Sequence, residues 1–195
     1  MILVENPMHT PVDSIRVLNV TQNDFERLAK IRAAAMRKSL ARVGRFDPKG
    51  SRTRLLVSFA PEFTRTIEVD GKTVGFYAAR RSETGVELEH LYILPKFQNR
   101  GIGSQVLHFI LEEAERLRLP VFVVAVKESA SNRFYRRHGF MPDGVGKWDN
   151  YYVRHSGMPA ALLYSSPQVP TIFSTDSCKC ACSSLGISSS QASMS

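Results

Sequence analysis

Residues 98–104, read QNRGIGS, form the segment whose residue types most clearly support a chemical role. Gly101 and Gly103 have no side chains, so an anion can approach the backbone closely and the chain can adopt positive φ. A helix that begins here leaves its first N–H groups unpaired, and these groups attract phosphate together with the helix dipole. Ser104 adds a hydroxyl donor. The segment therefore indicates a loop that binds phosphate or pyrophosphate.

Two common phosphate loops do not fit these residues. The P-loop requires Lys followed by Ser or Thr after its last glycine, and the dinucleotide-binding loop requires a third glycine shortly afterwards. Here Ser104 and Gln105 follow Gly103. A tight turn between a strand and a helix remains the alternative, because short glycine patterns are common.

The predicted neighbours of the loop are a strand and a helix. Residues 86–94 read as a strand that Pro95 closes, and residues 103–119 read as a helix with one apolar face. The apolar run at residues 121–126 is typical of a strand buried on both faces. A short helix at residues 130–138 should follow.

The other predicted elements lie on both sides of this unit. They are a strand at residues 15–20, a long helix capped by Thr21 and ending near Gly44, a helix at residues 51–59, a strand at residues 65–69, a turn at Asp70 and Gly71, a strand at residues 73–80, and closing strands from Phe140 and at residues 148–154. Strands with helices packed between them predict an α/β (α+β) fold with a mixed, partly parallel sheet flanked by helices.

Length and composition favour one domain with two appendages. The chain has 195 residues, 43% of them hydrophobic and 23% charged, as in globular proteins. We expect an N-terminal extension at residues 1–14, one domain at residues 15–155, and a serine-rich, disordered tail at residues 156–195. No window approaches the ~20 apolar residues of a membrane span, and no secretory signal is recognisable, so we expect a cytoplasmic protein without a membrane partner.

The net charge of +8 attracts polyanions in general. The basic residues are dispersed, without a recognition motif interleaved with aromatic residues, so a solvated basic surface is favoured and a nucleic-acid partner is not expected. Cys178, Cys180 and Cys182 share one short run without a fourth ligand, so we expect no metal site.

Two segments resemble motifs of a known family. LYILPKFQNRGIGSQVLHFILEEA is similar to motif A of the GNAT superfamily of N-acetyltransferases, whose loop pattern is Q/R-x-x-G-x-G/A, and FYRRHGF is similar to motif B. The resemblance runs from Ile15 to Arg154 and is most specific between Leu88 and Phe140. It implies a small bacterial-type GNAT enzyme with a centrally splayed sheet and acetyl-CoA as its cosubstrate.

The resemblance also implies which residues contact acetyl-CoA. The strand before the loop would pair with the pantetheine arm through its backbone, and the loop would bind the pyrophosphate. The implied cofactor-binding residues are Leu91, Tyr92, Ile93, Gln98, Asn99, Arg100, Gly101, Ile102, Gly103, Ser104, Ser129, Asn132 and Tyr135. The chain departs from the family pattern where Asn and Ala commonly precede the motif B tyrosine, since Ser129 and Ser131 stand there and Asn132 is out of register.

Acetyl transfer needs a neutral amine, a polarised thioester carbonyl and a protonated leaving thiolate. The resemblance makes Tyr135 the candidate acid. A tyrosine that only packs in the core beside Phe134 and Phe140 is the alternative. A backbone N–H near Tyr92 or Ile93 would polarise the carbonyl.

For the base we choose Glu89, with His90 as the second choice. Side chains alternate along a strand, so Glu87 and Glu89 should share one face and His90 the other. A solvated strand face or a salt bridge to Arg80 remains the alternative reading of the glutamates.

The acceptor is the least determined part of the reaction. Similarity of residues 35–37 and 151–154 to small bacterial-type members favours a primary amine of a small molecule over a protein or peptide amine. A non-catalytic acyl-CoA-binding regulatory module is the alternative from another class of function, and a basic nucleic-acid-binding domain is the third. The sequence leaves the oligomeric state open, a homodimer included.

Overall fold

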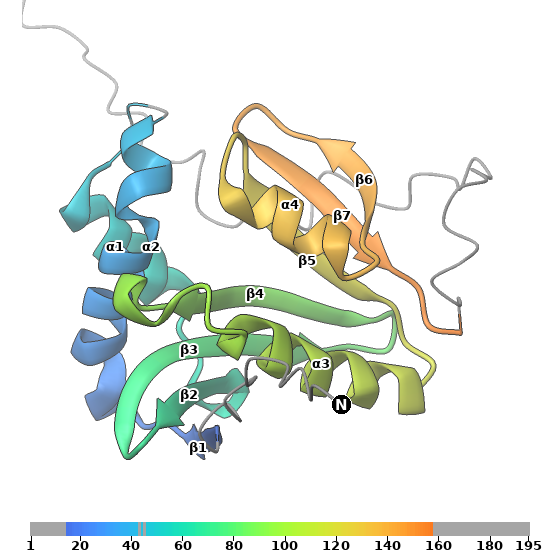
Figure 1. Cartoon of the computed structure of the whole chain (residues 1–195), viewed down its shortest axis with the longest axis horizontal. Helices are drawn as coiled ribbons and strands as arrows, with labels where there is room; N and C mark the ends of the chain where they lie inside the picture. Colours follow the sequence, from blue (N-terminus) through green and yellow to red (C-terminus); the bar gives the residue numbers. More distant parts are fainter. Residues whose placement is uncertain (1–14, 43, 45, 158–195) are drawn as a thin grey trace, which may run out of the picture.

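The computed structural model describes residues 15–42, 44 and 46–157 (Figure 1). Its strands are β1 (Arg16–Asn19), β2 (Thr64–Val69), β3 (Lys72–Arg81), β4 (Val86–Ile93), β5 (Val121–Val126), β6 (Met141–Val145) and β7 (Asp149–Arg154). Its α-helices are α1 (Phe25–Arg42), α2 (Pro48–Ser58), α3 (Ile102–Arg116) and α4 (Ala130–Arg137). The strands form one sheet in the order β1-β2-β3-β4-β5-β7-β6. The mixed α/β sheet flanked by helices is thereby confirmed.

Helices cover both faces of this sheet. On one face α1 and α2 pack around Leu28, Leu55 and Phe76, which are fully buried. On the other face α3 and α4 enclose a larger cluster that contains Leu107 and Tyr135. The two clusters make a three-layer arrangement with the sheet in the middle.

Local sequence explains several element boundaries. Asp70 and Gly71 have φ values of 51° and 69°, as the tight turn between β2 and β3 requires. The side chain of Asp47 accepts hydrogen bonds from the backbone N–H groups of Lys49 and Gly50, so α2 begins at Pro48, three residues earlier than predicted.

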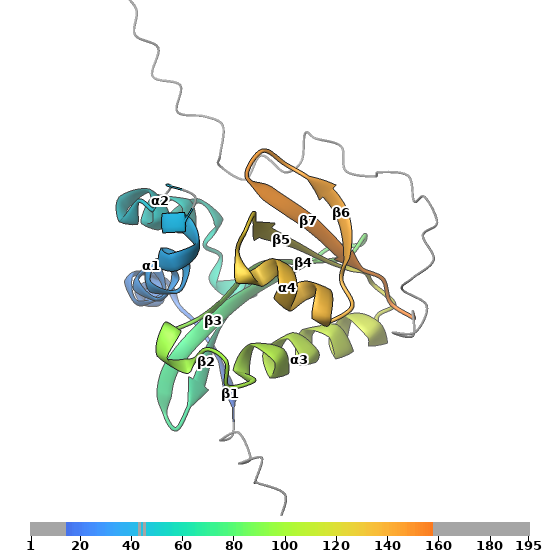
Figure 2. The same cartoon turned by 45° about the horizontal axis from the view of Figure 1, so that its top comes forward.

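The parallel strands β4 and β5 separate part of the way along the sheet. They pair only where Val86–Leu88 faces Val121–Val123. Beyond that point β5 continues in register with β7, whereas β4 continues with β3 (Figure 2). One side of the β4 backbone at residues 89–93 is therefore left without a strand neighbour, as a centrally splayed sheet requires.

The closing strands predicted from Phe140 and at residues 148–154 correspond to β6 and β7. β6 contains Pro142 and Gly144, and its register with β7 shifts between these residues. The predicted extension at residues 1–14 and nearly all of the predicted tail, with the three cysteines, lie outside the described residues. Within the described part, none of the helices is long and apolar enough to cross a membrane.

Candidate active site

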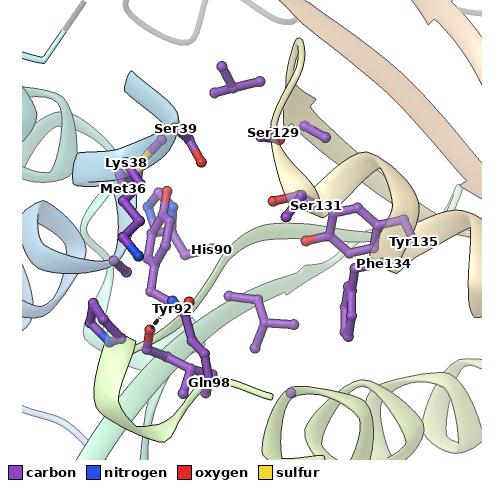
Figure 3. A pocket seen from close by; sticks show the side chains of 18 of the residues that line it. Met36, Lys38, Ser39, His90, Tyr92, Gln98, Ser129, Ser131, Phe134 and Tyr135 are labelled. Atoms are coloured by element: carbon purple, nitrogen blue, oxygen red, sulfur yellow. Dashed lines mark hydrogen bonds between the residues drawn. The ribbon is translucent and has the colours of Figure 1, made fainter. Parts of the chain in front are cut away.

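A cavity of about 560 Å³ lies where β4 and β5 diverge. Side chains from α1, β4, the loop before α3, β5 and α4 line it (Figure 3). Most of the predicted site residues are among them: Glu89, Leu91, Tyr92, Ile93, Gln98, Asn99, Gly101, Gly103, Ser104, Ser129 and Tyr135. Arg100, Ile102 and Asn132 are not.

The glycine loop presents free backbone donors to this cavity. Gly101 is the N-cap of α3 with φ of 81°, a conformation that favours glycine, and no side chain caps the helix. The first backbone hydrogen bond of the helix runs from the N–H of Gln105 to the carbonyl of Gly101. The N–H groups of the three residues between them are thus the unpaired donors expected at a helix start.

Within the loop, the side chains of Gln98, Arg100 and Ile102 have different surroundings, which the sequence did not predict. The Gln98 amide nitrogen donates to the Ile93 carbonyl at 2.8 Å, so this side chain fixes the loop to the end of β4. The Arg100 guanidinium lies 5.5 Å from the centre of the Phe97 ring. Ile102 is buried in the core. A contact of Ile102 with a ligand in this cavity would therefore use the backbone rather than the side chain.

Tyr135 lies in the hydrophobic core and also lines the cavity. Its ring packs in the core, with ring centres 5.3 Å from Phe134 and 5.4 Å from Phe140. Its hydroxyl points into the cavity, toward the side where His90 and Tyr92 lie (Figure 3). None of the described residues forms a hydrogen bond with this hydroxyl. Burial and the nearby Tyr92 phenol raise the pKa of Tyr135, so the phenol keeps its proton.

Glu89 lies at a β-bulge, which the sequence did not predict. On β3, Ala78 is opposite His90 and the next residue, Ala79, is opposite Leu88, so Glu89 is the extra residue of β4. The bulge breaks the alternation of side chains. The expectation that His90 points away from the face of Glu87 and Glu89 was therefore wrong, and Glu89 and His90 line the same cavity.

The Glu89 carboxylate is partly used within the protein. Arg80 Nε donates to Glu89 Oε1 at 3.0 Å, and the Arg80 guanidinium also lies over the Phe63 ring. The salt bridge kept open as an alternative therefore exists. Glu89 Oε2 has no hydrogen-bond partner among the described residues, so one carboxylate oxygen is still free to accept a proton.

His90 is buried between the sheet and the α1–α2 layer. Its Nε2 atom lies 2.9 Å from Ser58 Oγ, and its buried Nδ1 atom has no partner among the described residues. When the Ser58 hydroxyl donates to the Arg54 carbonyl, 3.2 Å away, Nε2 must donate to Ser58 and the lone pair is on Nδ1. Burial and the Arg32 guanidinium lower the pKa of His90 to about 4, although the Glu89 backbone opposes this shift.

Replacing His90 with Gln should reduce the acid sensitivity of the folded domain. Because the folded pKa of about 4 lies below the ordinary 6.5, the unfolded chain binds a proton more readily between these values. The unfolding free energy of the parent protein should therefore fall as the pH drops from 6.5 to 4, by up to about 3 kcal/mol from this residue. The measurement is Tm against pH over this range. The His108→Gln variant, altered at an exposed position on α3, is the control and should keep the parent slope; an unchanged slope in His90→Gln contradicts the assignment.

Asn132 supports α4 rather than the cavity. Its amide nitrogen donates to the carbonyls of Val126 and Ser129 at 2.8 and 2.9 Å. Its Oδ1 atom accepts from Asn150 Nδ2 at 2.7 Å and from the Tyr152 hydroxyl at 3.0 Å. The prediction that this side chain contacts the cofactor is not supported by its position, since these bonds tie α4 to β5 and β7. Ser129, the N-cap of α4, does line the cavity.

We expect Asn132→Ala to lower the unfolding free energy by about 3 kcal/mol, because it leaves several buried polar groups without partners. Urea unfolding measures the change, and acetyl-CoA affinity should stay close to that of the parent. Asn23→Ala, at an exposed position, is the matched control and should change stability by no more than about 0.5 kcal/mol. Equal midpoints for the two variants would show that the network contributes little.

Sequence reasoning missed Arg32 of α1 as a residue of the cavity. Arg32 lines it and is only 8% exposed. It lies four residues after Leu28, on the stripe of α1 that packs against the sheet. A charged residue on an apolar stripe was the available signal.

Comparisons with known proteins agree with this geometry. Residues 62–142 match the family model described as an acetyltransferase (GNAT) domain. The search of curated proteins finds no match.

Solved structures share the fold at low sequence identity. PaiA N-acetyltransferase from Thermoplasma acidophilum, in complex with coenzyme A, is 15% identical with a TM-score of 0.62, over 73% of this chain and 99% of that chain. An acetyltransferase from Thermus thermophilus is 18% identical with a TM-score of 0.59, over 74% and 98%. The ribosomal-protein-S18-alanine N-acetyltransferase from Escherichia coli is 15% identical with a TM-score of 0.56, over 78% and 100%.

The resemblance of the two motifs to the GNAT superfamily is thus confirmed. The matched region contains the splayed strand β4, the glycine loop and the helix that bears Tyr135. Residues 62–142 of this chain therefore match a GNAT acetyltransferase domain, and solved N-acetyltransferase structures share its fold.

Proposed function

We propose that this enzyme transfers the acetyl group of acetyl-CoA to a primary amine of a small molecule by direct attack, with Tyr135 as the general acid and Glu89 as the general base. The observation that carries the proposal is the Tyr135 hydroxyl, which points into the cavity without a hydrogen-bond partner among the described residues. A core tyrosine without a catalytic role would be expected to satisfy its hydroxyl elsewhere.

The cavity has the groups that acetyl-CoA requires. The unpaired N–H groups at the start of α3 suit a pyrophosphate. The Phe134 ring packs close to Gly103, since a Cβ added there would lie 3.6 Å from it. The side of β4 without a strand neighbour, at residues 89–93, offers backbone donors and acceptors to an amide-containing arm, apart from the Ile93 carbonyl, which accepts from Gln98. Arg133 and Arg137 at the rim add positive charge for phosphates.

The chemistry then follows from the placement of the side chains. The amine nitrogen attacks the thioester carbonyl carbon, the new C–N bond forms, and the C–S bond breaks. A backbone N–H near Tyr92 or Ile93 stabilises the oxyanion. Tyr135 donates its proton to the departing sulfur, and Glu89 Oε2 accepts the proton that the amine nitrogen loses.

Glu89 is favoured over His90 as the base because of their surroundings. His90 Nδ1 is buried, and a proton on this ring would add a second positive charge close to the Arg32 guanidinium. Glu89 has a free oxygen and a partly exposed side chain. His90 therefore serves better as a neutral wall of the site.

An acceptor panel tests the proposed function. Small primary amines and short peptides with a free α-amine or lysine are incubated with enzyme and acetyl-CoA, and products are identified by the mass of one added acetyl group. We expect small amines to give the higher kcat/KM. A clear preference for peptides would contradict the substrate class while leaving the acetyltransferase intact.

The non-catalytic module remains the competing function. It predicts that acetyl-CoA raises Tm while no amine of either class is acetylated.

A homodimer remains a prediction for this chain.

A further inference from the structure

Arg32 of α1 is a buried cation on the wall of the cavity. It is 8% exposed, and its Nη1 atom donates to the Ser51 carbonyl at 2.7 Å and to Ser51 Oγ at 2.6 Å. Its Nε atom is buried without a partner among the described residues, and none of them accepts a hydrogen bond from Nη2. Two of the three guanidinium nitrogens are therefore unused in the structure.

Arg32 also has no ion-pair partner in the described part of the chain. The groups around it are Ser51 from α2 and the rings of Tyr92 and His90 from β4. His90 is uncharged above its pKa of about 4. Of the acidic cavity residues, Glu89 is already paired with Arg80.

Burying an unpaired charge destabilises the folded protein, because no counter-ion offsets the lost hydration. The other cations of the cavity, Lys38, Arg42, Arg133 and Arg137, are exposed and keep their hydration. Arg32 therefore differs from them in being buried without a counter-ion among the described residues. A negatively charged ligand that binds beside Arg32 would offset this loss of hydration.

The position of Arg32 relates it to the acceptor rather than to the phosphates. Its guanidinium carbon lies 5.7 Å from the centre of the Tyr92 ring, and the Tyr92 phenol is close enough to Tyr135 to affect its pKa. The Tyr92 side chain thus links Arg32 to the proposed acid.

We propose that the acceptor is an amine that also carries a carboxylate, such as an amino acid, and that Arg32 binds this carboxylate through its unused nitrogens. This inference rests on the proposed function. Planar guanidinium and carboxylate groups form paired hydrogen bonds, which suits Arg better than Lys for this contact. Nη2 is the nitrogen open to a ligand, a contact through the buried Nε requires the side chain to move, and Nη1 stays on Ser51.

Matched acceptors test the inference on the parent enzyme. Each α-amino acid is compared with its amide and with the amine that lacks the carboxylate, and kcat/KM is measured from release of the CoA thiol. We expect the carboxylate member of each set to be favoured by about tenfold or more, the size of a hydrogen bond to a charged group. Equal rates within the sets, or a preference for phosphate-bearing amines over carboxylates, would overturn the proposal.

Variants then assign the preference to Arg32. Arg32→Gln should lower kcat/KM for carboxylate acceptors by about tenfold or more, mainly through KM, and leave the amides within about twofold. Arg32→Lys should keep part of the preference. Arg37→Gln removes the same charge from an exposed position of α1 outside the cavity and should keep all of it.

Two results separate the inference from other roles of Arg32. A weaker affinity for CoA in Arg32→Gln, with the acceptor preference unchanged, would assign Arg32 to the cofactor and overturn the proposal. If no amine of any class releases CoA from the parent enzyme, the proposed function itself fails. Should Arg32→Gln not fold, the comparison of acceptors on the parent enzyme still decides the question.

Discussion

Replacing Tyr135 with Phe should lower kcat for acetyl transfer by about 10²-fold or more, the typical contribution of a general acid. The dissociation constant of acetyl-CoA should stay within about twofold. The reason is structural: the ring packs against Phe134 and Phe140, and the hydroxyl forms no hydrogen bond with the described residues. Removing this oxygen therefore takes a proton donor from the cavity and leaves the packing intact. Steady-state kinetics and a binding titration on the same preparation measure both quantities.

Tyr92→Phe is the matched control, since Tyr92 is the phenol near Tyr135 in the same cavity. Its kcat should fall much less. Because burial raises the pKa of Tyr135, the parent kcat should also stay level into the alkaline range where an ordinary phenol, with a pKa of 10.0, begins to ionise. A large loss in Tyr92→Phe together with a normal rate in Tyr135→Phe would assign the proton to the other phenol.

Replacing Gly103 with Asp should weaken acetyl-CoA binding by about 10²-fold or more. The carboxylate would lie at the start of α3, beside the unpaired N–H groups that suit the pyrophosphate, and like charges at such short range repel strongly. Isothermal titration with CoA measures the loss. The thermal shift caused by acetyl-CoA should shrink in parallel.

The local geometry supplies two controls for this variant. An added Cβ at Gly103 would meet Phe134 at 3.6 Å and 3.7 Å, an ordinary contact, and the residue has no positive φ, so Gly103→Ala should fold normally. Gly103→Asn has the size of Asp without the charge and should bind CoA more tightly than Gly103→Asp. Equal affinity of the Asn and Asp variants would mean that charge at this position does not matter, contrary to the loop assignment.

Elements that depend on short-range interactions could be predicted from the sequence. The turn at Asp70 and Gly71 needs positive φ at both residues, and both have it. The predicted helix at residues 130–138 corresponds to α4, which ends at Arg137. The glycine loop could be assigned for the same reason, because a strand end, Gly101 and a helix start are adjacent in the chain.

The features that the sequence did not predict depend on contacts between distant segments. The bulge at Glu89 arises from the pairing of β4 with β3, and the pattern of β4 alone gives no reason for it. Asn132 reads as a cofactor contact until Asn150 and Tyr152, from a later strand, are seen to use its oxygen. Arg32 reads as an ordinary helix residue until its partner Ser51 and its burial are known.

We propose that this cavity joins acetyl-CoA binding to acetyl transfer. The most direct measurement is release of the CoA thiol from acetyl-CoA, with and without primary amines, by the parent enzyme and by Tyr135→Phe. We predict amine-dependent release with one acetylated amine formed per thiol, and its loss in Tyr135→Phe although acetyl-CoA still raises Tm. Equal thiol release by the two proteins would contradict Tyr135 as the acid, and a rise in Tm without release by the parent would contradict the enzyme.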